Sequence, residues 1–354
     1  MKIKTKIIPH TLQFRRPAKT SRSTYTDHRI WYVLVYDADN VAHWGIGECA
    51  PLVDLSCDYN DGYEQTLATC CAELEKTGLL NIDKLRPYPS ILFGLETAMK
   101  HLETQHFTLF DTPFSRGEAG IPINGLIWMG DMDYMLEQVE QKLSEGFNCI
   151  KLKIGAIDFE KEISLLEGIR KQYTATQITL RVDANGGFSV AEAPDRLERL
   201  AQLDIHSIEQ PIKAQQWEQM ASLCKNTPLP IALDEELIGI NKPDDKRRLL
   251  ETIQPQYIIL KPTLHGGIAG ATEWIELAKE LHIGWWITSA LESNVALNAI
   301  AQWTASLGVT QHQGLGTGML YVENALIPLT IKSGYLWFDP HQDVNLLDTN
   351  YLSI

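Results

Sequence analysis

Two lysines stand one residue apart in a short apolar run, Ile150-Lys151-Leu152-Lys153-Ile154, just before a stretch with helical periodicity. Alternate residues of a β-strand share a face, so Lys151 and Lys153 are expected to project together. Neighbouring ammonium groups repel and partial burial disfavours their charge, and both effects lower a lysine pKa and can make the amine a proton acceptor. Two such lysines without other signals more often mark a solvated strand edge. Whether they are catalytic therefore depends on the rest of the sequence.

Short apolar runs alternate with amphipathic stretches from residue 121 onward. Seven such repeats in succession predict parallel β/α units, and their number favours a barrel over an open sheet. In a barrel the C-terminal strand ends form one ring, so the side chains at those ends are expected to meet. The residues at the ends of these runs, about 25–30 positions apart, are Lys153, Asp183, Glu209, Asp234, Lys261 and Ser289.

Three of these ring positions are carboxylates, namely Asp183, Glu209 and Asp234. Converging carboxylates repel unless a cation joins them, and oxygen ligands from separate strands suit Mg²⁺, with Mn²⁺ as a substitute. A lysine that faces a metal-bound carboxylate substrate can remove the proton α to that carboxylate. Lys153 and Lys261 are expected on opposite faces of the substrate, one as the base and the other as an acid or a resting positive charge.

The first 120 residues have a different texture and predict a separate α+β domain. The remainder, 121–320, is expected to be the barrel with the active site, and 321–354 is expected to pack back on the first domain. The expected strands and helices of the first domain are Lys2–Phe14, Arg29–Asp37 and His43–Glu48, and Tyr63–Lys76 and Pro89–Thr104.

A polar, basic stretch, 15–23, separates the first two expected strands. It is expected to be a loop, either simply solvated or acting as a lid that recognises an anionic ligand. Ser21 and Arg22 are candidate substrate contacts on the basis of their position in this loop alone.

The net charge of −14 argues against a nucleic-acid partner and against binding to an anionic membrane. A small anionic carboxylate substrate remains compatible, because a metal ion and local lysines can reverse the potential inside a cleft. The six cysteines have no metal-binding spacing, which indicates free thiols in a reducing compartment. No apolar run is long enough for membrane insertion, so a cytoplasmic location is expected. The oligomeric state stays open, with a homo-oligomer as one option.

The ordered motifs of the barrel half resemble the enolase superfamily, in its muconate lactonising enzyme subgroup. This resemblance implies an N-terminal α+β capping domain before a modified (β/α)7β TIM-like barrel. It implies Lys153 as the base, Lys151 as its electrostatic companion, and Asp183, Glu209 and Asp234 as Mg²⁺ ligands. The motifs are Lys151-Leu152-Lys153, Asp183-Ala184-Asn185, Glu209-Gln210-Pro211, Asp234-Glu235 and Leu260-Lys261-Pro262.

Three further candidate residues each have two possible interpretations. Asn185 either bonds a metal ligand or substrate oxygen, or serves the turn that contains it. Glu235 is a supporting group next to the metal ligands or an outer metal contact. Ser289 either binds a substrate carboxylate or caps a helix.

Within the subgroup the chain resembles the o-succinylbenzoate synthase family, on the segments 47–52, 288–294 and 314–318. That likeness implies a lyase of menaquinone biosynthesis, which dehydrates 2-succinyl-6-hydroxy-2,4-cyclohexadiene-1-carboxylate. The alternatives are a dipeptide epimerase or an N-acylamino acid racemase. Dipeptide epimerases of this subgroup usually carry Asp-x-Asp at the last strand, whereas 314–318 contains no carboxylate. A non-catalytic ligand-binding barrel is remote, because both lysines and all three carboxylates are intact.

Overall fold

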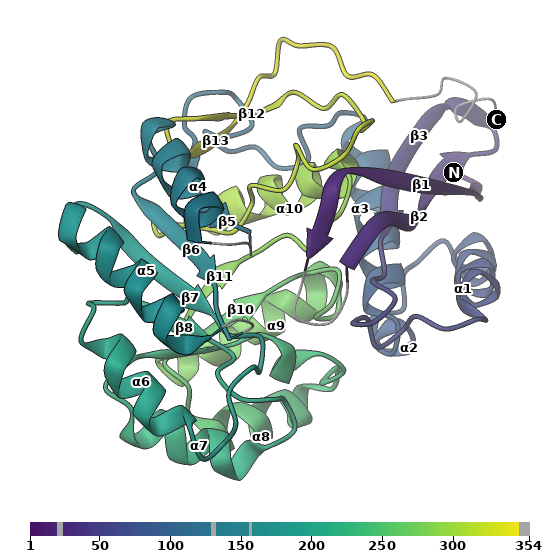
Figure 1. The fold of residues 1–354 in the computed structure, drawn as a ribbon. Helices are drawn as coiled ribbons and strands as arrows, with labels where there is room; N and C mark the ends of the chain where they lie inside the picture. The colour runs from purple at the N-terminus through teal and green to yellow at the C-terminus, as the bar shows by residue number, and fades with distance from the viewer. Residues whose placement is uncertain (20–23, 129–131, 156–157, 347–354) are drawn as a thin grey trace.

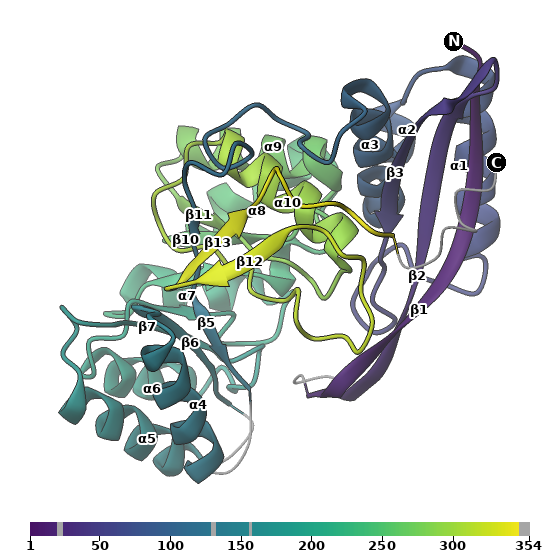
Figure 2. The ribbon, with the colours of Figure 1, turned by 90° about the horizontal axis from the view of Figure 1, so that it is seen from above.

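The computed structural model describes residues 1–19, 24–128, 132–155 and 158–346. Three long antiparallel strands open the chain, and a curled parallel sheet with helices on its outside follows (Figure 1). Seen from above, the antiparallel sheet and its helices stand beside the curled sheet (Figure 2). This arrangement confirms the fold class expected from the alternating pattern.

The N-terminal sheet has the order β1-β2-β3, and β2 is buried on both faces. Its odd-numbered residues, such as Trp31, share a core with helices α1 and α3, whereas its even-numbered residues, such as Tyr32, belong to the core that continues into the barrel. Side chains of β2 alternate between the two faces, and each face is covered by another layer. The strand therefore reads as a continuous apolar run in the sequence. The elements are β1 Ile3–Lys19, β2 Thr24–Asp37, β3 Asn40–Cys49, α1 Tyr63–Thr77, α2 Ile82–Leu85 and α3 Pro89–Thr104.

The basic stretch after the first strand differs from the expectation. β1 continues to Lys19 and pairs with β2 across a register shift between Gln13 and Ala18, so Arg15–Lys19 is strand and not loop. Ladder hydrogen bonds to β2 and the burial of Ala18 stabilise the extension. The candidates Ser21 and Arg22 lie at 20–23, outside the described residues.

Seven parallel strands form the curled sheet in sequence order, each hydrogen-bonded to the next. Gln313 closes the ring, because it bridges to Ile123 beside the first strand, and Gly314 bridges to Thr288 after the last. The Gln313 side chain also accepts the Ile287 amide, 2.7 Å away. The strands are β5 Gly125–Ile127, β6 Cys149–Lys153, β7 Thr179–Asp183, β8 Ser207–Glu209, β9 Ile231–Leu233, β10 Tyr257–Leu260 and β11 Gly284–Ile287.

Helices connect the strands on the outside of the barrel, as a right-handed β/α crossover requires. Most have a polar outer face and an apolar inner one, and their buried residues join one continuous core. They are α4 Met132–Ser144, α5 Phe159–Gln172, α6 Ala193–Ala201, α7 Trp217–Asn226, α8 Pro243–Ile253, α9 Gly267–Glu280 and α10 Asn294–Ser306, with a short 3-10 turn at Glu235–Leu237.

The C-terminal segment adds a small sheet that the sequence did not predict. β12 (Leu329–Lys332) and β13 (Tyr335–Phe338) pair with β4 (Ile121–Pro122), which is separate from the barrel sheet. Tyr321 pairs with Phe14 of β1. We keep the division into 1–120, which we call the capping domain, and a barrel over 121–320 as a proposal. No helix of the described residues has both the length and the apolarity to cross a bilayer.

His101, inside the capping domain, gives a test of this packing. The Ile46 amide donates to its Nδ1 (3.1 Å), and burial lowers the pKa of the ring to about 4 from 6.5. The unfolded chain therefore takes up a proton first as pH falls, so stability is lost below pH 6.5. Relative to His101→Asn, we expect the wild type to lose about 2 kcal/mol more between about pH 7.5 and 5, measured by urea unfolding. Equal pH dependence of both proteins would contradict this.

Candidate active site

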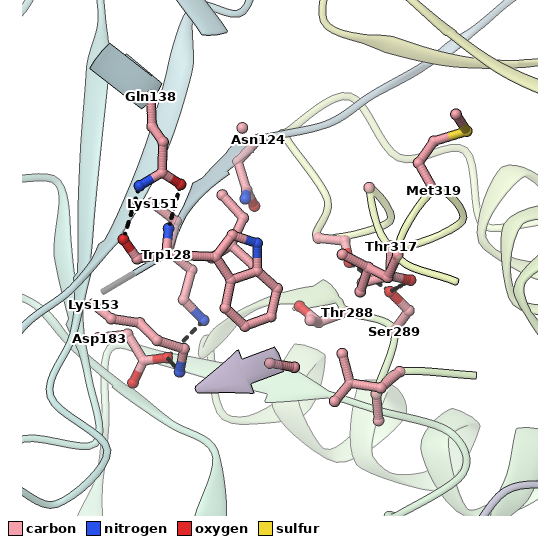
Figure 3. A pocket seen from close by; sticks show the side chains of 18 of the residues that line it. Asn124, Trp128, Gln138, Lys151, Lys153, Asp183, Thr288, Ser289, Thr317 and Met319 are labelled. Atoms are coloured by element: carbon pink, nitrogen blue, oxygen red, sulfur yellow. Dashed lines mark hydrogen bonds and ion pairs between the residues drawn. The ribbon is translucent and has the colours of Figure 1, made fainter. Parts of the chain in front are cut away.

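A cavity of about 990 Å³ opens where the C-terminal strand ends meet. Lys151 and Lys153 line it from β6, and Asp183 follows on β7 (Figure 3). Strand register sets this neighbourhood, because Lys153 pairs with Asp183 and Asp183 pairs with Glu209. Lys153, Asp183 and Glu209, which are about equally spaced in the sequence, thus lie at one level of the barrel.

The capping domain and the segment that follows the last barrel helix complete the walls of the cavity. Arg15, Arg16 and Tyr25 line it from the first two strands, and Thr317 and Met319 line it from the far side. The cavity therefore combines cationic groups, hydroxyls and apolar surface, which fits a small anionic molecule with a carbon skeleton.

The lysines and carboxylates form two groups of ion pairs. The Lys151 amine lies 3.0 Å from Asp183 Oδ2 and also contacts Glu209 Oε2. Lys153 lies 3.2 Å from the same oxygen of Asp183, and Lys261 contacts Asp234 Oδ2. The lysine side chains are only 11–12% exposed, so these charges interact with little screening by water.

The expectation of a depressed lysine pKa is wrong for Lys151. Burial by itself lowers the pKa of this amine, but the charges of Asp183 and Glu209 outweigh burial and raise it above the usual value. The pKa of Lys261 is raised in the same way, chiefly by Asp234, against burial. Opposite charges at contact distance therefore decide the protonation of both amines, and repulsion between lysines is the smaller effect.

The carboxylates have shifted pKa values of opposite direction. Burial opposes ionisation of Asp183, yet Lys151 and Lys153 lower its pKa well below the usual range. Burial, together with the charge of Asp183, raises the pKa of Glu209. Glu209 does not line the cavity and lies beneath the Lys151 amine. Asp183 is therefore firmly ionised, whereas burial opposes ionisation of Glu209.

Asp183, Glu209, Asp234 and Glu235 are the oxygen donors available to a divalent cation. Within the described residues no three His, Cys, Asp or Glu side chains gather closely enough to hold a metal as they stand, since lysine amines lie between them. In the same residues Oε1 of Glu209, Oδ1 of Asp234 and Oε2 of Glu235 are buried and accept no hydrogen bond. Buried anionic oxygens without donors suit a hard cation, so these residues fit Mg²⁺.

Asn185 connects the base candidate to this set. Its Oδ1 accepts from Lys153 (2.7 Å), its Nδ2 donates to Glu235 Oε1 (3.0 Å), and its backbone amide donates to Asp183 Oδ1 (3.0 Å). Its φ of +42° is a conformation that asparagine tolerates better than most residues. Asn185 therefore serves its turn and also orients Lys153 and Glu235.

Ser289 lines the cavity opposite the lysines. Its hydroxyl lies 2.7 Å from that of Thr317 and donates to the Gly314 carbonyl (3.1 Å) (Figure 3). The residue that caps α10 is Ser293, whose Oγ accepts the Val295 amide. Ser289 is thus placed for a ligand, and the capping role falls to its neighbour.

Sequence reasoning missed several lining residues. Trp128 follows the first barrel strand and places its ring in the cavity, while the Gln138 side chain pairs with its backbone at 2.9 and 3.0 Å (Figure 3). The strand-end rule that found the lysines would also have selected Trp128, had apolar residues been considered. Thr317 and Asn124 have no comparable signal in the sequence, because they approach the cavity from irregular segments.

Comparison with known proteins identifies the family. Residues 134–339 match the family described as "Enolase C-terminal domain-like". An o-succinylbenzoate synthase from Desulfotalea psychrophila is 46% identical, over 92% of this chain and 96% of that protein. The chain belongs to the enolase superfamily. The expected recognition is confirmed, and with it the enolase-type capping domain and barrel.

Solved structures of the superfamily agree with this fold. The crystal structure of MenC from Desulfotalea psychrophila matches with a TM-score of 0.84 and 42% identity, over 95% of this chain and 100% of that one. A dipeptide epimerase from Cytophaga hutchinsonii, complexed with Mg and the dipeptide D-Ala-L-Val, matches with a TM-score of 0.83 over 100% of this chain and 98% of that one. Its 21% identity shows the shared superfamily fold alone.

Proposed function

We propose that the chain is an o-succinylbenzoate synthase, a lyase that removes water from 2-succinyl-6-hydroxy-2,4-cyclohexadiene-1-carboxylate. The observation that carries this proposal is the 46% identity to an o-succinylbenzoate synthase along nearly the whole of both chains. The barrel supports it, since Lys153, Lys261, Asp183 and Asp234 line one cavity and Glu209 contacts Lys151 beside them. The product would serve menaquinone biosynthesis.

The proposed chemistry begins with Lys153. Its neutral amine takes the proton from C1, α to the substrate carboxylate, and the C–H electron pair becomes a ring double bond as the C6–OH bond breaks. Lys153 then returns the proton to the departing hydroxide, which leaves as water on the same face. Asn185 and Asp183 hold the Lys153 amine at 2.7 and 3.2 Å, so its position is set before substrate arrives.

Asp183, Glu209 and Asp234 are the residues proposed to hold Mg²⁺, with Glu235 beside them. When bound, the cation supplies electrostatic stabilisation of the negative charge that develops on the substrate carboxylate. Lys151 keeps Asp183 and Glu209 together through its two contacts. Lys261 stands over Asp234 as a fixed positive charge beside the substrate ring. Mn²⁺ is proposed as a substitute, because it accepts the same oxygen ligands.

Epimerisation of a dipeptide is the second candidate function. It would use both lysines for 1,1-proton transfer, and the similarity to a dipeptide epimerase fold keeps it in view. Against it, the segment 314–318 presents the Thr317 hydroxyl and no carboxylate for a substrate ammonium. The decisive assay incubates the purified protein and Mg²⁺ with the cyclohexadiene carboxylate, and in parallel with an L,L-dipeptide or an N-succinylamino acid. Formation of o-succinylbenzoate supports the proposal, and epimerisation alone rejects it.

Lys261→Arg separates the two uses of this lysine. A guanidinium keeps the charge but cannot give up a proton near neutral pH. We expect dehydration to fall about 10-fold through altered packing, whereas any 1,1-proton transfer falls at least 10²-fold, within the range of general acid–base catalysis. Both rates are measured on one preparation. Equal loss of both activities would assign Lys261 a direct part in proton transfer during dehydration.

A cytoplasmic location is proposed on the state of the cysteines. All six lie in the described residues, and none forms a disulfide. Reduced thiols are typical of a reducing compartment.

A further inference from the structure

One wall of the cavity is the loop between β11 and α10. Thr288, Ser289, Ala290 and Leu291 line the cavity in succession. Leu291 has a φ of +67°, a left-handed conformation that is unusual for leucine. Such a conformation persists only where surrounding contacts hold it, so the groups that bind this loop determine the shape of the wall.

Glu48, on β3 of the capping domain, holds the end of this loop. The side chain is completely buried and lies outside the cavity lining. Its carboxylate accepts the Ser293 amide (2.8 Å), the Ala296 amide (3.0 Å) and the Ser293 hydroxyl. Tyr32 of β2 donates to the same hydroxyl at 3.2 Å. The start of α10 is thus capped by a residue that comes from another domain and is 245 positions away in sequence.

The strained residue is held in a similar way. The Leu291 carbonyl accepts a hydrogen bond from the Tyr321 hydroxyl and lies 2.9 Å from Nδ1 of His28 on β2. The other ring nitrogen of His28 lies 3.1 Å from the Pro51 carbonyl. Both ends of the segment 291–293 therefore depend on buried polar side chains from outside the barrel helices.

We propose that Glu48 is a positioning residue for the active site, which fixes the 288–293 wall and with it the Ser289 hydroxyl. This inference rests on the proposed function and extends it, since it assigns the capping domain a part in setting the geometry of the site. Loss of Glu48 should therefore slow catalysis, because catalysis is sensitive to small displacements of substrate-binding groups.

Glu96 provides a matched control. It lies on α3 of the capping domain and accepts the Ile268 and Ala269 amides (2.7 and 3.0 Å) at the start of α9. Gly267 makes room for it, because a Cβ there would lie 2.3 Å from Glu96 Oε2. Burial raises the pKa of both Glu48 and Glu96 to about 7. The two carboxylates thus make the same kind of interdomain helix cap, but the helix that Glu96 caps does not follow the 288–293 wall.

The experiment compares Glu48→Gln, Glu48→Asp and Glu96→Gln at about pH 8, where both carboxylates are ionised in the wild type. A glutamine amide nitrogen cannot accept, so Glu48→Gln leaves at least one donor without a partner. We expect both glutamine variants to melt at lower temperature. At a temperature where all are folded, Glu48→Gln should lose about 10- to 100-fold in kcat/KM, with KM raised, and Glu96→Gln should stay within about two-fold of wild type. Glu48→Asp, which keeps the charge, should recover part of the loss.

Hydrogen exchange gives a readout that does not depend on activity. Amides of 288–296 should exchange faster in Glu48→Gln, and those of 266–270 in Glu96→Gln. If Glu48→Gln does not fold, Ser293→Ala, which removes one of the three donors, takes its place. Wild-type kcat and KM in the Glu48 or Ser293 variant, or equal losses in the Glu48 and Glu96 variants, would overturn the inference. A wild type without dehydratase activity would instead reject the proposed function, and exchange at 288–296 would still decide the inference.

Discussion

Lys153→Ala is expected to reduce the dehydratase rate by about 10⁴-fold while Mg²⁺ binding persists. The amine is the only group in the proposed mechanism that takes the α-proton, and it also returns a proton to the departing hydroxide. Its loss therefore affects both bond changes. The carboxylates proposed to hold Mg²⁺ keep Lys151 and Lys261 as partners. The measurements are single-turnover formation of o-succinylbenzoate and calorimetric Mg²⁺ titration.

Two controls make this result specific. Lys100→Ala removes a lysine of α3 that pairs with Glu103 on the surface, and it should leave the rate unchanged. Small primary amines added to Lys153→Ala should restore part of the rate, since they replace the missing base. Retained turnover in Lys153→Ala would reject the base assignment, and loss of Mg²⁺ binding would show that the lysine supports the metal ligands instead.

Removal of divalent cations is expected to reduce turnover by about 10³-fold or more, since electrostatic stabilisation by a bound metal contributes several kcal/mol. Exhaustive chelation followed by addition of Mg²⁺ tests this, and the rate should return. A second readout is thermal: a ligand that binds only the folded state raises the melting temperature. The buried oxygens of Glu209 and Asp234 that accept no hydrogen bond are where that stabilisation should originate.

A pair of carboxylate variants tests whether the effect of Mg²⁺ is specific to the proposed metal ligands. Asp234→Asn should abolish the Mg²⁺-dependent rise in melting temperature. Asp58 is another buried carboxylate, which accepts hydrogen bonds from Ser90 and does not line the cavity. Asp58→Asn should lower the melting temperature and keep the Mg²⁺ effect. Full turnover in rigorously metal-free buffer would refute the metal assignment.

The barrel and its ring of charged residues could be predicted because both depend on periodicity. Lys153, Asp183 and Glu209 occupy equivalent positions in successive units, and strand register brings them to one level. The pKa direction of Lys151 could not be predicted, because it depends on which carboxylates contact the amine. The sequence shows that Lys151 neighbours Lys153, but the stronger partners, Asp183 and Glu209, come from other strands.

Contacts between elements far apart in the chain could not be predicted from the sequence either. Glu48 lies in an expected strand and in a family-like segment, but its hydrogen bonds to the start of α10 depend on the relative placement of two domains. The extension of β1 to Lys19 was missed because Arg15, Arg16 and Pro17 suggest a loop. Pairing with β2 outweighs that local preference, as tertiary context often does.

The closure of the barrel through Gln313 and Gly314 has a consequence for biosynthesis. A ribosome synthesises the chain from its N-terminus, so all seven barrel strands emerge before the segment that completes the ring. Until then the strand carrying Lys153 and the strand carrying Ser289 have no shared edge to align them. The two edges of the sheet can therefore meet only after 313–314 has been made, although the strands that carry the lysines and the acids are already neighbours in the sheet.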